Sequence, residues 1–144
     1  MTPKEDPLKL TKQLCFPLYT ASRLVTKCYQ PFLNKLGLTY PQYLVLLVLW
    51  EDDGIRLSDI AAKLLLQSNT LTPLLKRMEE MNLVERIRSS EDERSIIISL
   101  TEKGKDLRIE AEQVPHQIGE NLKITTGEAK QLYGLLYKLI SNLE

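Results

Sequence analysis

Residues 68–100 read SNTLTPLLKRMEEMNLVERIRSSEDERSIIISL, a helical pattern that gives way to two strand-like segments. Apolar side chains recur in the first half at spacings of three and four, at Leu71, Leu74, Leu75 and Met78. This spacing predicts a helix from a Ser68 cap to about Met81 with one apolar face. Residues 83–88 and 94–100 are rich in β-branched side chains and flank the polar segment 89–93, which predicts a β-hairpin with a charged tip.

A second short helix precedes this segment. Ser58 is a suitable N-cap for residues 59–65, whose apolar side chains share one face, and residues 66–67 form the turn to the next helix. Two short helices joined by a tight turn and followed by a hairpin have the order of a winged helix-turn-helix, in which the second helix enters a DNA major groove.

Helices are predicted on both sides of this unit. Residues 14–36 form a helix that stops at Gly37 and that Pro31 should kink or split. A capping box at Thr39 and Gln42 opens a buried helix over 43–50, Thr101 caps a long helix over 101–122, and a further capping box starts a last helix at 125–128. The apolar faces of these helices exceed what a small core requires, so pairing with a second chain is expected.

The predicted fold class is therefore mainly α with a small β-hairpin wing, a dimeric winged helix-turn-helix. The whole chain, 1–144, is one unit in which 39–100 form the DNA-binding region and 8–38 and 101–144 supply dimerisation helices.

Composition is that of an ordinary globular protein, with 43% hydrophobic and 26% charged residues. The 19 Lys and Arg balance the 19 Asp and Glu, so nonspecific DNA binding should be weak and reduced by salt. The start of the chain does not have the pattern of a signal peptide and no run of 18 apolar residues occurs, so we expect a cytoplasmic protein with no membrane partner. With two cysteines and only His116 besides, neither a metal site nor a cofactor is expected.

The polar face of the predicted recognition helix suits base and phosphate contacts. Its candidate residues are Ser68, Asn69, Thr70, Thr72, Pro73, Lys76 and Arg77, and the hairpin adds Arg86, Arg88 and Arg94. Arg94 can reach a minor groove, and Asp92 is placed to orient its guanidinium. The alternative is an ordinary solvated surface shared with nearby glutamates, and the order of elements favours DNA.

Pro17 places the start of the first helix near residues 14–16, so Cys15 lies at a helix N-terminus, where the dipole favours the thiolate that peroxides attack. Tyr19 follows one turn later on the same face. Tyr29 shares that face but lies ~20 Å further along a straight helix, so it can meet Cys15 only from another subunit. A similar separation excludes an intrachain disulfide with Cys28 unless the helix breaks. The alternative is that Cys15, like Cys28, is a small buried hydrophobic residue.

Three segments carry a resemblance to a known family: LCFPLYTASRLVTKCYQPFL (14–33), LTYPQYLVLLVLWE (38–51) and SNTLTPLLKRMEEMNLVERIRSSEDERSIIISLTEKG (68–104). Over nearly its whole length the chain resembles the MarR family, and within it the organic hydroperoxide resistance regulators. The resemblance implies a homodimer bound to double-stranded DNA at a pseudo-palindromic operator. It also implies that Cys15 is the peroxidatic cysteine and that Tyr19, Tyr29 and Tyr40 surround it, one of them from across the dimer.

Members of that subgroup with a resolving cysteine carry it toward the C-terminal helices, where this chain has none, so the chain resembles the one-cysteine type. The expected function is a repressor released when organic hydroperoxide oxidises Cys15, with a low-molecular-weight thiol, or Cys28 of the partner, completing a disulfide. We do not expect an enzyme: a thiol peroxidase is disfavoured because no arginine or threonine adjoins Cys15 in the sequence to stabilise a leaving oxyanion. A regulator gated by a phenolic ligand, with an incidental thiol, stays open.

Overall fold

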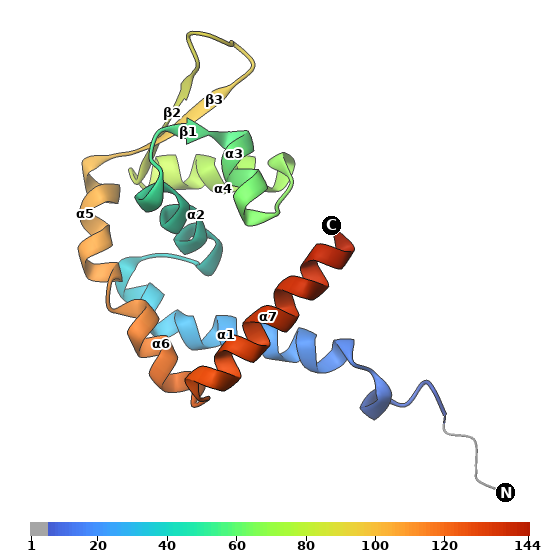
Figure 1. Ribbon diagram of the computed structural model, residues 1–144. Helices are drawn as coiled ribbons and strands as arrows, with labels where there is room; N and C mark the ends of the chain where they lie inside the picture. The colour runs from blue at the N-terminus through green and yellow to red at the C-terminus, as the bar shows by residue number, and fades with distance from the viewer. Residues whose placement is uncertain (1–5) are drawn as a thin grey trace, which may run out of the picture.

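Figure 1 shows the computed structural model, which describes residues 6–144. The chain is mostly helical and contains one small antiparallel sheet, in agreement with the predicted fold class. The elements are η1 (Leu10–Lys12), α1 (Cys15–Leu36), α2 (Tyr40–Glu51), β1 (Ile55–Arg56), α3 (Leu57–Leu64), α4 (Ser68–Glu80), β2 (Val84–Arg88), β3 (Ile96–Leu100), α5 (Glu102–Ala111), α6 (Val114–Leu122) and α7 (Thr126–Leu143).

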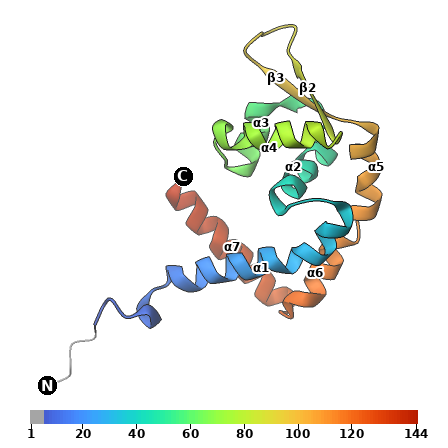
Figure 2. The ribbon, with the colours of Figure 1, turned by 180° about the vertical axis from the view of Figure 1, so that it is seen from behind.

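The elements divide into two layers. The sheet, α3 and α4 lie at one end of the molecule, and α1, α6 and α7 lie at the other, with α5 running between them, as both views show (Figures 1 and 2). α1 packs against α6 and α2, and α5 contacts α1, α2 and β3. The DNA-reading candidates and Cys15 therefore belong to opposite layers of the fold.

The sheet has the strand order β1-β3-β2 and is antiparallel throughout. Val84 pairs with Leu100 at the base of the hairpin, and Arg88 pairs with Ile96 near its tip. The carboxylate of Asp53 accepts hydrogen bonds of 2.8 Å from the backbone N–H groups of both Gly54 and Leu100, so the end of α2 is fastened to the base of β3.

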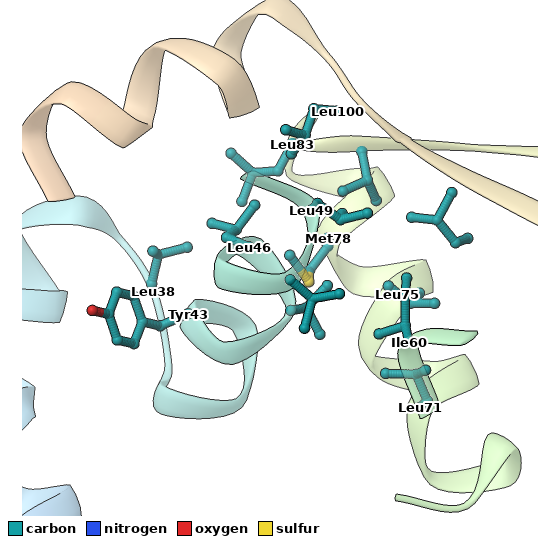
Figure 3. Close-up of a cluster of buried hydrophobic side chains, with 14 of the residues drawn as sticks. Leu38, Tyr43, Leu46, Leu49, Ile60, Leu71, Leu75, Met78, Leu83 and Leu100 are labelled. Carbon is teal, nitrogen blue, oxygen red and sulfur yellow. The ribbon is translucent and has the colours of Figure 1, made fainter. Parts of the chain in front are cut away.

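The hydrophobic core is centred on α2, as expected for a helix apolar on nearly every side. Its side chains meet the inner faces of α3 and α4 and the base of the hairpin (Figure 3). Fully enclosed members include Leu46, Leu49, Ile60, Leu71, Leu75, Met78 and Leu83. Within residues 6–144 no one helix has both the length and the apolarity of a membrane span; α1 and α2 do so only as a pair bent by 71°, and half of the residues of α2 are buried.

Two predicted helix starts are wrong. α3 begins at Leu57, because the Asp59 carboxylate accepts the backbone N–H of Arg56 at 3.3 Å and so caps the helix from within its first turn. Ser58 is consequently an ordinary helical residue. α4 has Gln67 as its N-cap, and Ser68 is its first helical residue rather than its cap.

Two prolines bear on the bounds of the predicted helices. Pro31 does not split α1, since it removes one amide donor on an exposed face where water can satisfy the freed carbonyl. The long helix expected over 101–122 is instead two helices, with Pro115 in the first turn of α6, where its missing N–H costs nothing. The two-residue strand β1 was not predicted, because it is too short to show a pattern.

Candidate functional site

The outer face of α4 is polar and open. Leu71, Leu75 and Met78 are completely buried on its inner face. The remaining side chains predicted to contact DNA are exposed except for Thr72, which is half-buried: Ser68, Asn69, Thr70, Pro73, Lys76 and Arg77. The helix is thus held by its apolar face and presents short polar groups followed by two cations.

Thr72 and Pro73 modify the middle of this face. The Thr72 hydroxyl donates a hydrogen bond of 2.8 Å to the carbonyl oxygen of Ser68, so its proton is already in use and only its lone pairs are available to a ligand. Pro73 lies inside the helix and lacks the N–H that would bond to the Asn69 carbonyl. That carbonyl is therefore an additional acceptor on the exposed side of the helix.

A groove of about 370 Å³ separates α4 from the hairpin and is lined by Thr72, Lys76, Arg86, Arg88 and Ile96. Lys76 and Arg88 are exposed and have no acidic partner in the described part of the chain. Arg86 differs, because its Nε lies 3.5 Å from a carboxylate oxygen of Glu79. The predicted cations are therefore of two kinds, free and paired.

The wing tip is organised by Asp92. Its carboxylate accepts the backbone N–H of Arg94 at 3.0 Å and the hydroxyl of Ser95 at 3.2 Å. In the DNA-free chain the short carboxylate folds back on the backbone two residues ahead, as in an Asx turn, and that Asp92 orients the Arg94 guanidinium on DNA stays a prediction. The Arg94 side chain is exposed beyond this turn.

Cys15 is the first residue of α1 and its thiol is exposed, which rules out a buried hydrophobic role within the isolated chain. Tyr19, one turn later, is also exposed, and the Arg23 guanidinium lies 5.2 Å from the centre of its ring. Cys15 and Tyr19 thus share the solvent-facing start of the helix.

An apolar groove of about 520 Å³ runs between the start of α1 and the second half of α7. Its lining residues are Leu14, Pro17, Leu18, Ala21, Leu132, Leu135, Leu136, Lys138, Leu139 and Asn142. No side chain of α7 is buried, although the helix carries a full apolar stripe. Cys15 is the sequence neighbour of Leu14, which lines this groove, but is not itself a lining residue.

Three tyrosines cluster where α1 meets α2. The ring of Tyr29 lies 4.8 Å from that of Tyr40 and 5.8 Å from that of Tyr43, centre to centre. Burial first, then Tyr40 and Tyr43, raise the pKa of Tyr29 from 10.0 to about 12; burial also raises the pKa of Tyr40 and of Tyr43. All three hydroxyls therefore stay protonated near neutral pH and can donate hydrogen bonds.

The structure brings Tyr29 and Tyr40 together but leaves Cys15 and Tyr19 on the other half of α1. Tyr43 was missed by the sequence analysis, although its position three residues after Tyr40 on one helix places both on the same side. Cys28, next to Tyr29, is half-buried against the core. No group of three or more metal-ligating side chains occurs within residues 6–144.

Comparison with known proteins adds to this geometry. A family model described as transcriptional regulator SarA/Rot matches residues 27–111. The organic hydroperoxide resistance transcriptional regulator of Bacillus subtilis (strain 168) is 49% identical over 143 residues, which cover 99% of this chain and 97% of that protein.

Solved structures are similar over nearly the whole chain. AbfR of Staphylococcus epidermidis, in its reduced and its overoxidized forms bound to DNA, has a TM-score of 0.77 at 40% identity, with 94% of this chain covered and 94% and 95% of those chains. Its disulfide form gives a TM-score of 0.66 at 42% identity, with 93% and 91% covered. A MarR-family regulator from Rhodococcus sp. RHA1 gives 0.79 at 25% identity, with 92% and 95% covered. The chain belongs to the MarR family of winged helix-turn-helix transcriptional regulators, within the group of organic hydroperoxide resistance regulators.

Proposed function

We propose that the protein is a cytoplasmic repressor that binds a pseudo-palindromic operator as a homodimer and is released when organic hydroperoxide oxidises Cys15. One observation carries the proposal: an exposed thiol begins α1 directly after Leu14, a lining residue of a large apolar groove that a second copy of the chain can fill. A sensor placed at a subunit interface can change the relative position of two DNA-reading units.

Dimerisation through α1 and α7 is supported by the surface that each copy leaves uncovered. Large apolar side chains are exposed on both helices, among them Phe16, Leu18, Leu24, Leu132, Leu135 and Leu139. A contiguous apolar surface of this kind is uncommon on a monomer, and a two-fold axis lets the same surface cover itself. The two α4 helices then meet two successive major grooves, with Arg94 of each wing reaching toward a minor groove.

The oxidation step needs only the thiol, the peroxide and a second thiol. The Cys15 thiolate attacks one peroxide oxygen, the O–O bond breaks, and the alkoxide takes up a proton and leaves as the alcohol, so the sulfur becomes a sulfenic acid. A low-molecular-weight thiol then attacks this sulfur, and the hydroxyl leaves as water to give a mixed disulfide. The rings of Tyr29 and Tyr40 lie 4.8 Å apart, on the other half of α1 from Cys15, so we assign both of them, rather than one, to the partner subunit as donors to the sulfur, together with Tyr19 from the same chain.

Structures of AbfR support a distinction between the first oxidation of the cysteine and the later formation of a disulfide. Reduced and overoxidized AbfR are each known bound to DNA, whereas the disulfide form of AbfR is less similar to this chain, with a TM-score of 0.66 against 0.77. We therefore assign release to the disulfide: a new group on Cys15 adds bulk at the interface, which rotates the two DNA-reading units apart.

The test is operator binding by fluorescence anisotropy, with the upstream DNA of the chain's own gene. Wild type, Cys15→Ser and the matched control Cys28→Ser are compared before and after an organic hydroperoxide, with and without a small thiol. We expect release of wild type and of Cys28→Ser, full only when the thiol is present, and no release of Cys15→Ser. Release of the Cys15→Ser variant by peroxide would contradict the sensing role, and sustained peroxide turnover with the thiol would indicate a peroxidase.

A second candidate is a regulator gated by a phenolic ligand. The α1–α7 groove favours it, since about 520 Å³ lies within the usual size range of small-molecule pockets. Titration of phenolic compounds against the reduced protein separates the two: ligand-driven release of Cys15→Ser supports gating by a bound molecule, and release only by oxidant supports the thiol switch.

A further inference from the structure

We propose that Arg86 is a positioning residue rather than a phosphate contact: Glu79 of α4 holds it and thereby fixes the wing relative to the recognition helix. The sequence placed Arg86 among the DNA-binding residues together with Arg88 and Arg94. The binding tests of this inference rest on the proposed operator binding. The inference deepens that proposal, because it divides the basic residues into those that hold the site in shape and those that contact DNA.

One carboxylate binds both the backbone and the side chain of Arg86. Glu79 Oε2 accepts the backbone N–H of Arg86 at 3.2 Å, and Glu79 Oε1 lies 3.5 Å from the Arg86 Nε. Glu79 belongs to the last turn of α4 and Arg86 to the middle of β2. The pair therefore joins the end of the recognition helix to the centre of the wing strand through two contacts that cannot both survive a shift of that strand.

The pair is also more enclosed than the other Lys or Arg ion pairs of residues 6–144. The side chain of Arg86 is 20% exposed and that of Glu79 43%, whereas Lys63 and Asp52 are 45% and 58% exposed. The Nε of Arg86 is shut off from solvent, and its contact with Glu79 at 3.5 Å is an ion pair that does not have hydrogen-bond geometry. A charge enclosed in this way needs its counter-charge, so removal of Glu79 costs more than removal of an ordinary surface partner.

The consequence of the pair is the shape of the groove between α4 and the wing. Arg86 sits opposite Ile98 in the sheet, while Arg88 sits one step nearer the tip, opposite Ile96. Lys76 and Arg88 line the groove from its two sides without acidic partners in the described range. The Glu79–Arg86 pair, here called the clamp, thus holds Lys76 and Arg88 at a fixed separation, and these two unpaired cations bind the DNA phosphates.

The decisive variant is Glu79→Gln, because two interpretations predict opposite signs. If Glu79 were only a negative charge near DNA, its neutralisation would tighten binding. If it holds the wing, binding weakens, and we expect a loss on the order of tenfold. Glu80→Gln is the matched control: it removes the same charge from the neighbouring, exposed position, which has no partner among the described residues.

The dependence of affinity on salt distinguishes a positioning residue from a phosphate contact. Loss of one phosphate contact lowers the slope of log K against log salt by about 0.9. We expect this for Arg88→Gln, whereas Arg86→Gln should weaken binding with the slope unchanged. The double variant Glu79→Gln/Arg86→Gln should bind about as weakly as either single variant, because both remove the same clamp.

Hydrogen exchange of the DNA-free protein tests the clamp without any operator. The Arg86 amide and its β2 neighbours should exchange faster in Glu79→Gln than in Glu80→Gln. Unchanged exchange, tighter binding by Glu79→Gln, or a lower salt slope for Arg86→Gln would each overturn the proposal. If wild type itself failed to bind upstream DNA, the proposed function would fall while the exchange result still decided the clamp.

Discussion

The indole Nε1–H of Trp50 donates a hydrogen bond of 2.9 Å to the carbonyl oxygen of Gly104. This bond joins the last turn of α2 to the first turn of α5, where the chain leaves the wing and turns toward the α1–α6–α7 layer. The connection between the two layers thus depends on a defined polar contact as well as on apolar packing.

Replacement of Trp50 by Phe should remove this bond, while the Gly104 carbonyl keeps the helical N–H of Arg108 as its partner. We expect a loss of about 0.5–1.5 kcal/mol in the free energy of unfolding, the net worth of one hydrogen bond, because the carbonyl keeps its helical partner. Urea denaturation followed by circular dichroism measures it, and an unchanged midpoint would show that water replaces the indole without penalty.

Gly104 itself is required on steric grounds. A Cβ at this position would overlap the carbonyl oxygen of Leu83, which is rigid backbone at the base of the hairpin. Gly104→Ala should therefore destabilise the fold by about 1–3 kcal/mol. Gly119→Ala, in an exposed helical position with open space around it, is the control and should be neutral or slightly stabilising.

Alkaline pH should destabilise the fold through Tyr29. The folded state holds the Tyr29 proton with a pKa of about 12 against an ordinary value of 10.0, so the folded state binds more protons than the unfolded state above pH 10. The contribution of this group is complete below about pH 10 and is lost as the pH rises toward 12. Denaturation across this range should show a smaller alkaline loss for Tyr29→Phe, and equal slopes for both proteins would contradict the assignment.

A charge in the α1–α7 groove should prevent dimerisation. Leu139→Glu places a carboxylate on the groove lining, where a second copy is proposed to bind, and should shift the protein to a monomer in analytical ultracentrifugation. Ser141→Glu adds the same charge to an exposed position of α7 outside the groove lining and should leave the assembly unchanged. A dimeric Leu139→Glu protein would place the interface elsewhere.

Arg94→Ala should weaken operator binding by about tenfold or more, as expected for loss of a groove-reading arginine. Dimerisation and stability should not change, because the side chain is exposed and Asp92 holds the turn through the backbone of residue 94. Glu93→Ala serves as the control at the adjacent exposed position. Normal affinity of Arg94→Ala would remove the wing tip from the interface.

Local signals account for what the sequence predicted well. The three- and four-residue spacing in α4 and the β-branched segments of the hairpin are properties of neighbouring residues, as are the capping boxes at Thr39 and Thr125, and all appear in the structure. DNA-binding candidates on the outer face of α4 were identified because burial of one helix face determines which residues face out.

Relationships across elements could not be predicted in this way. Arg86 and Arg88 are equivalent in sequence, and only the turn between α4 and β2 decides that Glu79 reaches one and not the other. Tyr43 joins Tyr29 through the crossing of α1 and α2, which no spacing reveals. The bond from the Arg94 N–H to the Asp92 carboxylate depends on the backbone conformation of the tip, which the sequence alone does not show.

The hydrogen bond from β3 to Asp53 gives the hairpin a fixed base and leaves its tip free. Its base is bonded to the end of α2 and paired with β1, whereas residues 89–95 are held mainly by hydrogen bonds within the turn itself. The length of this tip segment can therefore vary by insertion or deletion without disturbing the core. Relatives of this chain can thus adapt their reach along DNA separately from the chemistry of the thiol.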